Sequence, residues 1–468
     1  RHWSASAGGE SAFLAFDPDA PNKVMGGSYL GTIELLDIES SASTNIMIDP
    51  NLYLGLAARD MKYLYNWNAP ILRSMHEENT YFHGAQYLLK TTDEGLSWTE
   101  ISPDLTRNDD SKQGKGGGPL TNEAVGAENY GTLSYVIESP HEAGVIYTGS
   151  DDGLLYLSKD GGETWTNITP KNLNETLINS IEVSPHDPAT VYFAATRYKF
   201  NDFTPEIYKS ENYGKTWKLI TNGIAQNSYT RVIREDTQRK NLLFAGTFDG
   251  LYVSFDGGKQ WDSLQLNLPI TPITDIAVAH DDVVIATQGR SFWILDDLEL
   301  IRQYNNQKSK DITLYTPSNT VWPNWYGGMN SNAADGTGMF TGVNPASGMV
   351  IYYELDEVNA NEVLYLNIKN EAGELVNAFS SQTDADYIAY EGAPGKDPVL
   401  SAKKGINRFV WNLRHQSLPG IPKVYIEGGF SGHKAIPGTY TLELSYGDKR
   451  AQLSTTIGAN PLINLSAE

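Results

Sequence analysis

The sequence predicts an all-β fold in which a propeller of six to seven four-stranded blades is followed by a β-sandwich. Three observations carry this prediction. A tryptophan-containing box recurs four times, short apolar strands surround each copy of the box, and alternating strands return near the C-terminal end. The expected boundaries are 1–300 for the propeller, 301–345 for a connector and 346–468 for the sandwich.

The recurring box has the form Ser/Thr-x-Asp/Asn-x-Gly-x-x-Trp. In a tight turn between strands, the Asp or Asn oxygen accepts backbone N–H bonds, Gly takes a positive φ and Trp packs between strands. An amide at Asn212 fits a turn acceptor but not a general acid or base. We therefore expect a structural role for all four boxes, which comprise Asp93 with Trp98, Asp160 with Trp165, Asn212 with Trp217, and Asp256 with Trp261.

Each box ends a wider unit of short strands. An apolar strand, a polar turn such as SPHDP and a second strand such as TVYFAAT come first, and a third strand then runs into the box. The box tryptophans are 67, 52 and 44 residues apart, and propeller blades repeat at roughly 40–50 residues with loop insertions lengthening some steps. Two units without a box, one near the start and one at 274–297, bring the number of blades to at least six. A seventh could come from the N-terminal or the following segment.

The composition changes after the last of these units. Residues 301–345 are rich in Gly, Asn and aromatic residues without a clean period, which indicates a connector. Alternating strands such as MVIYYEL and GTYTLELSYG then suggest a sandwich of the immunoglobulin or fibronectin kind. This domain either covers and positions the propeller or binds carbohydrate. The second role would require Trp411 or Tyr440 to be exposed, whereas we expect both to fill the core of the sandwich.

Bulk properties exclude several classes of partner. The net charge of −22, from 57 acidic against 35 basic side chains, would repel phosphate backbones and anionic lipid, so we expect neither nucleic-acid binding nor membrane insertion. The absence of cysteine excludes disulfides and thiolate metal sites. The histidines show no HExxH spacing, and three of them (His76, His141 and His186) lie in inter-strand turns. No metal and no cofactor is therefore expected.

The boxes resemble the Asp-box repeats of sialidases, sortilin-type receptors and xyloglucan-cleaving endoglucanases. The stretches AARDMKYLYNWNAPI, GSDDGLLYLSKDGGETW and ATQGRSFWILDD more closely resemble exported bacterial BNR-repeat "glycosyl hydrolases" with a sortilin-N-terminal-like propeller. This resemblance implies an extracytoplasmic location, whether secreted, periplasmic or on the cell surface. Those relatives carry another propeller first, so the chain would correspond to their C-terminal half, with the preceding propeller as a partner. Because the chain starts at Arg1, we expect that a leader or a longer N-terminal region has been removed.

Candidate catalytic residues lie where propeller ligands normally bind, at the mouth of the central channel. The loops GSDDGLL and GTFDGLY place Asp151, Asp152 and Asp249 at equivalent positions of boxed blades. In the xyloglucanase-like relatives, a carboxylate in a similar strand-Asp-Gly-Gly-strand stretch acts as general acid or base. The pattern there is closer to TDVGG, which Asp151 matches in part and Asp249 less. The alternative is that Asp-Gly only forms a hairpin turn.

Other side chains near blade-strand ends could bind a ligand, namely Tyr130, Tyr198 and Arg290. A glycosidase needs two carboxyl groups roughly 5–10 Å apart, a distance that sequence does not provide. A sialidase needs three convergent arginines, for which the candidates are Arg59, Arg197, Arg231 and Arg290. The sialidase arginine motif itself does not occur.

Two classes of function remain open. The first is an extracytoplasmic binding or assembly protein that recognises a protein, a peptide or a glycan at the propeller face. The second is an endo-acting, xyloglucanase-like glycoside hydrolase with a two-carboxylate mechanism. The sequence favours the first, because the boxes tolerate Asn and the Asp-Gly pairs have a simple turn role.

Overall fold

The computed structural model describes residues 6–10, 13–50, 56–114, 129–279, 281–304, 312–322, 346–384, 387–421, 424 and 429–460. The chain divides into two compact units. The first, here called the propeller unit, comprises Arg1–Ala279 and Val283–Ile294. The second, the sandwich unit, comprises His280–Asp282 and Leu295–Glu468. Among the described residues no helix is long and apolar enough to cross a membrane.

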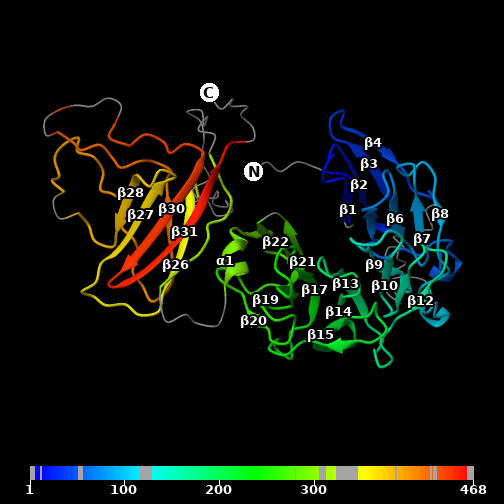
Figure 1. Cartoon of the computed structure of the whole chain (residues 1–468). Coiled ribbons are helices and arrows are strands. Elements are labelled where there is room, and N and C mark those ends of the chain that lie inside the picture. Colours follow the sequence, from blue (N-terminus) through cyan, green and yellow to red (C-terminus); the bar gives the residue numbers. More distant parts are fainter. Residues whose placement is uncertain are drawn as a thin grey trace. The chain divides into compact units, whose positions relative to one another are not determined.

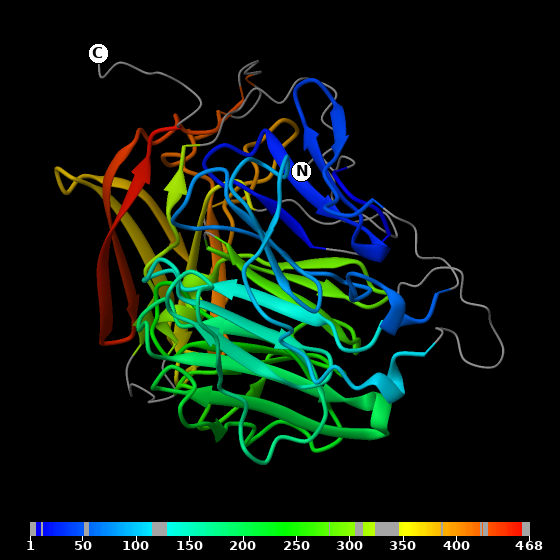
Figure 2. The same cartoon turned by 90° about the vertical axis from the view of Figure 1, so that its right-hand side faces the viewer.

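Six antiparallel sheets, each built from consecutive strands, form the described part of the propeller unit, and they follow one another in chain order (Figures 1 and 2). We number them as blades one to six. Blade one holds β1 (Leu14–Phe16), β2 (Lys23–Gly27), β3 (Ile33–Asp37) and β4 (Ala42–Asn45). Blade two holds β5 (Ile71–Arg73), β6 (Tyr81–Gly84), β7 (Leu88–Thr91) and β8 (Thr99–Glu100). Blade three holds β9 (Leu133–Glu138), β10 (Ile146–Ser150), β11 (Leu155–Ser158) and β12 (Thr166–Asn167).

The remaining blades continue this pattern. Blade four holds β13 (Leu177–Val183), β14 (Val191–Arg197), β15 (Asp202–Ser210) and β16 (Lys218–Leu219). Blade five holds β17 (Thr230–Glu235), β18 (Leu243–Thr247), β19 (Leu251–Ser254) and β20 (Asp262–Ser263). Blade six has three strands, β21 (Ile273–Ala279), β22 (Asp282–Thr287) and β23 (Phe292–Leu295). The predicted all-β propeller is confirmed, with six blades in the described residues.

The position of a strand in its blade explains its composition. Second strands such as β10 and β18 are buried along their whole length, because neighbouring blades cover both faces, and they read as short apolar runs. The fourth strands have only two to four residues and are exposed. Gly149 in β10 lies so close to Ile178 of the next blade that a Cβ atom would overlap its side chain. Glycine therefore sets the spacing between blades three and four.

The propeller unit has two chemically different faces. Because each blade is an antiparallel meander, the turns after the first and third strands lie at one edge, which we call the box face. The turns after the second strands and the connections between blades lie at the other edge, which we call the connection face. First strands of neighbouring blades contact one another, as β9, β13, β17 and β21 do in sequence. These first strands therefore line the centre of the unit.

The box tryptophans join each blade to the preceding one. Each indole N–H donates to the carbonyl oxygen of an isoleucine that directly follows the fourth strand of the preceding blade. The pairs are Trp98 to Ile46 (2.8 Å), Trp165 to Ile101 (2.9 Å), Trp217 to Ile168 (2.7 Å) and Trp261 to Ile220 (2.6 Å). Trp261 is buried and the other three are half-buried against apolar clusters. The box thus fastens consecutive blades at their outer edges.

Within the box, the carboxylate and the amide make equivalent bonds. Oδ1 of Asp160 accepts from the Ser158 hydroxyl (2.9 Å) and the Thr164 N–H (2.9 Å). Oδ1 of Asn212 accepts from the Ser210 hydroxyl (3.0 Å) and the Thr216 N–H (2.9 Å), and its Nδ2 donates to the Thr216 hydroxyl (2.8 Å). Hydrogen bonds from Thr164 lower the pKa of Asp160. The carboxylate is therefore committed to holding the turn.

A second set of contacts between blades involves the three turn histidines. Nε2 of each ring lies 2.8 Å from a backbone carbonyl oxygen of the following blade, with His76 bound to Ser139, His141 to Ser184 and His186 to Asp236. Since a carbonyl can only accept, Nε2 carries the proton. These histidines lie on the box face and connect blades two to five, so they are structural.

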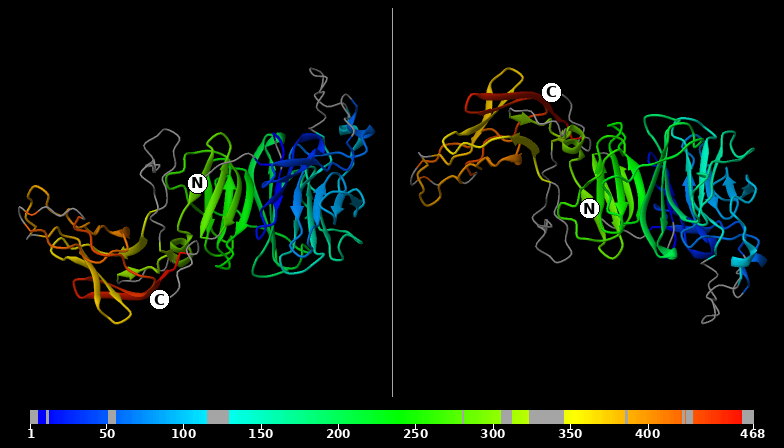
Figure 3. Two further views of the ribbon diagram at one scale, coloured as in Figure 1. Left: turned by 90° about the horizontal axis from the view of Figure 1, so that it is seen from above. Right: turned by 90° about the horizontal axis from the view of Figure 1, so that it is seen from below.

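The sandwich unit consists of two sheets, seen from two sides in Figure 3. One has the order β24 (Thr313–Leu314), β26 (Met349–Leu355) and β29 (Gly405–Trp411). The other has the order β25 (Thr320–Val321), β31 (Lys449–Gly458), β30 (Gly438–Tyr446), β27 (Leu364–Asn370) and β28 (Leu375–Ser380). Helix α1 (Leu298–Gln303) precedes them.

The observed limits of the sandwich unit differ from the expected connector at 301–345. Strand β24 pairs with β26 and β25 pairs with β31, so part of that stretch belongs to the sandwich sheets. Such two-residue strands lack the alternation that reveals longer ones. The Gly- and Asn-rich part of the expected connector, residues 323–345, lies outside the described residues.

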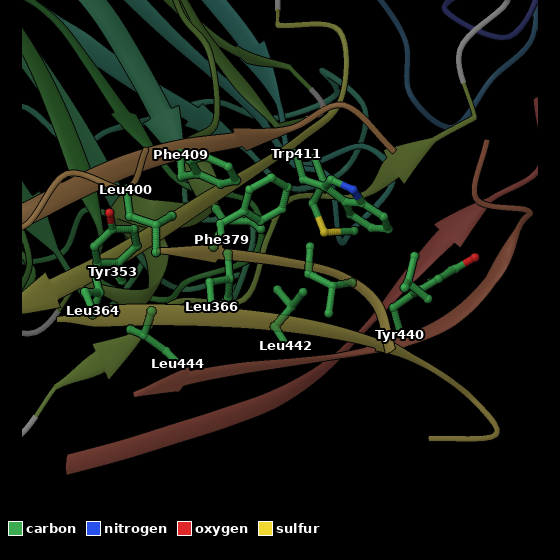
Figure 4. Packing of buried hydrophobic residues seen from close by; sticks show 14 of the residues in the cluster. Tyr353, Leu364, Leu366, Phe379, Leu400, Phe409, Trp411, Tyr440, Leu442 and Leu444 are labelled. Carbon is green, nitrogen blue, oxygen red and sulfur yellow. The ribbon is translucent and has the colours of Figure 1, made fainter. Parts of the chain in front are cut away.

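Alternating apolar residues of both sheets form the core of the sandwich unit. The side chains of Trp411 and Tyr440 are 0% and 3% exposed, and their rings pack edge to face 5.5 Å apart (Figure 4). Both residues thus fill the core, as the sequence predicts, and neither is exposed as carbohydrate binding through them would require.

Candidate functional site

Aromatic side chains gather on the connection face at blades four and five. Tyr229, just before β17, stacks on Tyr198 with ring centroids 5.3 Å apart at 26°. It also contacts Phe248 at 5.1 Å and Phe203 at 5.9 Å. Tyr229 is buried at the centre, whereas Phe203 and Phe248 are exposed. We call these four residues the aromatic cluster, and its exposed faces offer apolar stacking surfaces.

One arginine stands beside the aromatic cluster. Arg231 is the extra residue of a β-bulge in β17, between Thr230 and Val232, and a bulge redirects a side chain at a strand end. Its guanidinium lies 5.8 Å from the ring of Tyr198 and 5.7 Å from that of Tyr229. Its buried Nε has no hydrogen-bond partner within the described residues. The bulge thus presents a cation over aromatic rings.

The other three arginines near strand ends are held by the protein itself. Arg59 pairs with Asp110 at 3.1 Å, and Arg197 pairs with Asp202 at 2.7 Å. Arg290 donates to the carbonyl of Gly289 (3.0 Å), next to it in its own turn. These contacts leave Arg231 as the arginine best placed to bind a ligand anion or hydroxyl.

Asp151 holds the connection between blades two and three. Its Oδ1 accepts from the backbone N–H groups of Gly131 (3.0 Å) and Thr132 (2.9 Å). Its Oδ2 faces the amide of Asn66 at 3.5 Å. Burial raises the pKa of Asp151 to about 7. A carboxyl group with that pKa is half-protonated near neutral pH, which a general acid requires.

The other two candidate carboxylates are bound by their own turns. Asp152 accepts from the Ser150 hydroxyl (2.5 Å) and from the backbone N–H of Arg107 (2.7 Å). Asp249 accepts from the Thr247 hydroxyl (2.8 Å) and from Ser228. Both side chains thus brace connection-face loops, the turn role that was the alternative for Asp-Gly pairs.

Tyr130 belongs to a polar group beside Asp151. Its hydroxyl donates to Glu175, which also pairs with Lys112 at 2.6 Å. The Lys112 ammonium lies 5.1 Å from the Tyr130 ring. These side chains come from the connections entering β9 and β13, so the structure brings Tyr130 near Asp151 and places Tyr198 in the aromatic cluster.

An ionic network crosses the centre of the unit, with Tyr135, Glu182 and Arg234 half-buried and Asp275 exposed. Arg234 on β17 donates to the Tyr135 hydroxyl and to Asp275, both at 2.9 Å, and lies 3.8 Å from Glu182. Burial raises the pKa of Glu182 to about 7. The network joins the first strands of blades three to six. No group of three or more His, Cys, Asp or Glu side chains placed to hold a metal occurs in the described part of the chain.

The pKa of Asp151 leads to a prediction about pH. A raised folded-state pKa means that its contribution is full below the unfolded value near 4 and is lost as pH rises through 7. The free energy of unfolding of Asp151→Asn relative to that of the wild type should therefore increase from pH 5 to pH 7, by up to about 1.4 kcal/mol per pH unit, and level off above pH 7, which thermal melts at each pH would measure. Glu182 titrates in both proteins, so the difference isolates Asp151. A difference that does not change with pH would show that Asp151 is not perturbed.

No family model matches the chain. It is 23% identical over 321 residues to a probable oligoxyloglucan-reducing end-specific xyloglucanase of Neosartorya fischeri, covering 61% of this chain and 37% of that protein. It is 27% identical over 143 residues to an oligoxyloglucan-reducing end-specific xyloglucanase of Emericella nidulans, covering 28% and 17%. The chain thus covers little more than a third of the length of the Neosartorya fischeri protein. Its similarity to xyloglucanases is distant.

Solved structures show distant likeness as well. The GH74 xyloglucanase of Xanthomonas campestris matches with a TM-score of 0.44 and 16% identity, over 66% of this chain and 49% of that one. The GH74 enzyme of Niastella koreensis matches with a TM-score of 0.42 and 14% identity, over 94% and 64%. PorZ of Porphyromonas gingivalis matches with a TM-score of 0.41 and 12% identity, over 95% and 59%.

Proposed function

We propose that this chain is an extracytoplasmic propeller protein that binds a polysaccharide on its connection face at blades four and five. The observation that carries the proposal is Arg231, set by a bulge beside the aromatic cluster with a buried Nε that has no partner in the described residues. The exposed rings of Phe203 and Phe248 can stack on sugar faces. The guanidinium supplies donors for hydroxyl or carboxylate oxygens.

The distant similarity to xyloglucanases supports xyloglucan as the first ligand to test. The Neosartorya fischeri protein extends well beyond the part of it that matches this chain. We therefore include in the proposal a preceding propeller of the same full-length protein, of the BNR and sortilin-like kind, on the other side of the polysaccharide.

A glycoside hydrolase acting on xyloglucan is the second candidate. It is favoured by one observation, the pKa of about 7 that burial gives to Asp151. The two-carboxylate mechanism needs a second free carboxyl group, and Asp152 and Asp249 are engaged by their own turns. Binding therefore ranks first.

Calorimetric titration of the whole chain with xyloglucan oligosaccharides, cellohexaose and oligogalacturonate tests this function. Phe248→Ala should weaken binding about 5- to 30-fold, because it removes a stacking face worth about 1–2 kcal/mol. Phe16→Ala is the matched control, since Phe16 is exposed to a similar extent (46% against 43%) at the end of β1 that leads to the box face. Arg231→Met should weaken binding of the uronate more than that of the neutral sugars.

The remaining outcomes separate the alternatives. If the wild type shortens xyloglucan and Asp151→Asn does not, the protein is a hydrolase. If none of the sugars binds, the glycan ligand is wrong, and a peptide or protein ligand takes its place on the connection face.

A further inference from the structure

The sandwich unit has a cleft that its core does not fill. The cleft has a volume of about 670 Å³, within the range of roughly 300–1,000 Å³ typical of small-molecule sites. Its walls are the outward face of β27 and β28 and residues of the stretches 382–384, 387–398 and 417–420. All of these residues belong to the sandwich unit, so the cleft is independent of the propeller faces.

Tyrosines dominate the walls of the cleft. Tyr365 alternates with buried Leu364 and Leu366 on β27, so its ring stands on the outward face and is 49% exposed. The hydroxyl of Tyr387 donates to the Pro394 carbonyl (2.9 Å), which fixes the orientation of its ring. Tyr390 lies against Gly420, where any side chain would overlap its hydroxyl. The cleft is thus lined by three phenol rings, two of which are held by their loops.

The charged groups of the cleft disfavour an anion. Two carboxylates, Asp384 and Asp397, line it with one cation, Lys396. The Lys396 ammonium lies 5.4 Å from the Tyr387 ring, and Ser417 donates to Asp397 at 3.4 Å. Carboxylates accept hydrogen bonds from hydroxyl groups, and an ammonium donates to them. A neutral molecule with many hydroxyl groups and flat apolar faces fits this lining.

Addition of a peptide strand at this place is opposed by the backbone. Strand β28 is the edge of its sheet, and peptides bind such edges through main-chain hydrogen bonds. Here Gln416 donates to the Val376 carbonyl (3.1 Å) and Leu400 donates to the Ser380 carbonyl (2.8 Å). The edge is therefore already occupied by the chain itself.

We infer that this cleft of the sandwich unit is a second ligand site, which binds a short neutral oligosaccharide through the rings of Tyr365 and Tyr387 and the side chains of Asp397 and Lys396. The inference does not rest on the connection-face site, because no residue is shared. In this inference the residues of the sandwich unit that contact sugar are surface tyrosines, whereas Trp411 and Tyr440 fill the core.

Titrations of the whole chain with cellotetraose, xylotetraose, mannotetraose and oligogalacturonate test the inference. Tyr365→Ala and Ile388→Ala should each weaken binding of a neutral tetraose at least 10-fold. Ile388 lines the cleft and is 74% exposed, so Ile436→Ala is the matched control, because Ile436 is 73% exposed and does not line it. Each variant is also combined with Phe248→Ala, which removes the connection-face stacking surface, so that binding at the cleft is measured separately.

Three results would overturn the inference. One is that neither Tyr365→Ala nor Ile388→Ala weakens the binding of any neutral tetraose. Another is that Ile436→Ala weakens binding as much as Ile388→Ala. The third is that oligogalacturonate binds more tightly than the neutral tetraoses and that Tyr365→Ala or Ile388→Ala weakens its binding. That result would show that the cleft binds an anion and not a neutral sugar. If only Phe248→Ala weakens binding, the connection-face proposal stands and the cleft is not a site.

Discussion

Trp261→Ala is expected to lower the free energy of unfolding of the propeller unit by about 3–5 kcal/mol. The indole is 1% exposed and packs among apolar side chains of blades four and five. Its N–H also donates to the Ile220 carbonyl at 2.6 Å. Truncation leaves a cavity and an unpaired carbonyl at the contact between these blades. Calorimetry of the propeller transition measures the effect.

Two further variants separate the contributions of packing and hydrogen bonding. Trp261→Phe keeps most of the buried ring but loses the N–H donor, so it should cost about 1–3 kcal/mol. Leu219 on β16 is 49% exposed. Leu219→Ala should therefore change the free energy of unfolding by no more than about 0.5 kcal/mol. If Trp261→Ala destabilises no more than Leu219→Ala, the box does not fasten the blades.

Arg234→Met should destabilise the propeller unit by a similar amount, about 3–5 kcal/mol. The substitution removes the donor to Tyr135 and Asp275 and leaves the half-buried Glu182 without its cation. Burial raises the pKa of Glu182 to about 7 even in the presence of Arg234. An isolated carboxylate at that position is therefore costly.

The double variant Arg234→Met with Glu182→Gln provides the control. Neutralising Glu182 should recover part of the lost stability, because no unpaired charge remains between blades four and five. If the double variant is as unstable as the sum of the two single variants, the loss arises from packing and not from charge.

Much of the fold could be predicted because it depends on local patterns. Apolar runs between polar turns specify the strands, and each box closes its turn within eight residues, as Ser254 to Trp261 shows. The link from each tryptophan to the preceding blade could not be predicted, since it joins residues about 40 to 65 positions apart. The spacing Ser-x-His at 74–76, 139–141 and 184–186 is a repeat that could have indicated the histidine contacts.

The candidate site was less accessible from sequence. Sequence identified Tyr198 and Arg231 among residues near strand ends, but the bulge that redirects Arg231 has no sequence pattern. Tyr229, Phe203 and Phe248 meet Tyr198 only because two blades bring their loops together. Sequence placed Asp151, Asp152 and Asp249 at equivalent positions, but it gives no sign that burial raises the pKa of Asp151 to about 7 and also raises that of Asp152.

Hydrogen–deuterium exchange of the whole chain with saturating xyloglucan oligosaccharide would locate the surface on which the polysaccharide binds. Binding on the connection face predicts slower exchange in the peptides that carry the aromatic cluster and Arg231, namely 197–203, 228–231 and 247–250. The box peptides 158–165 and 254–261 should exchange at unchanged rates, because the box face serves as scaffold. Slower exchange in the box peptides, with unchanged exchange in the peptides of the aromatic cluster, would show that the ligand binds the box face and not the connection face.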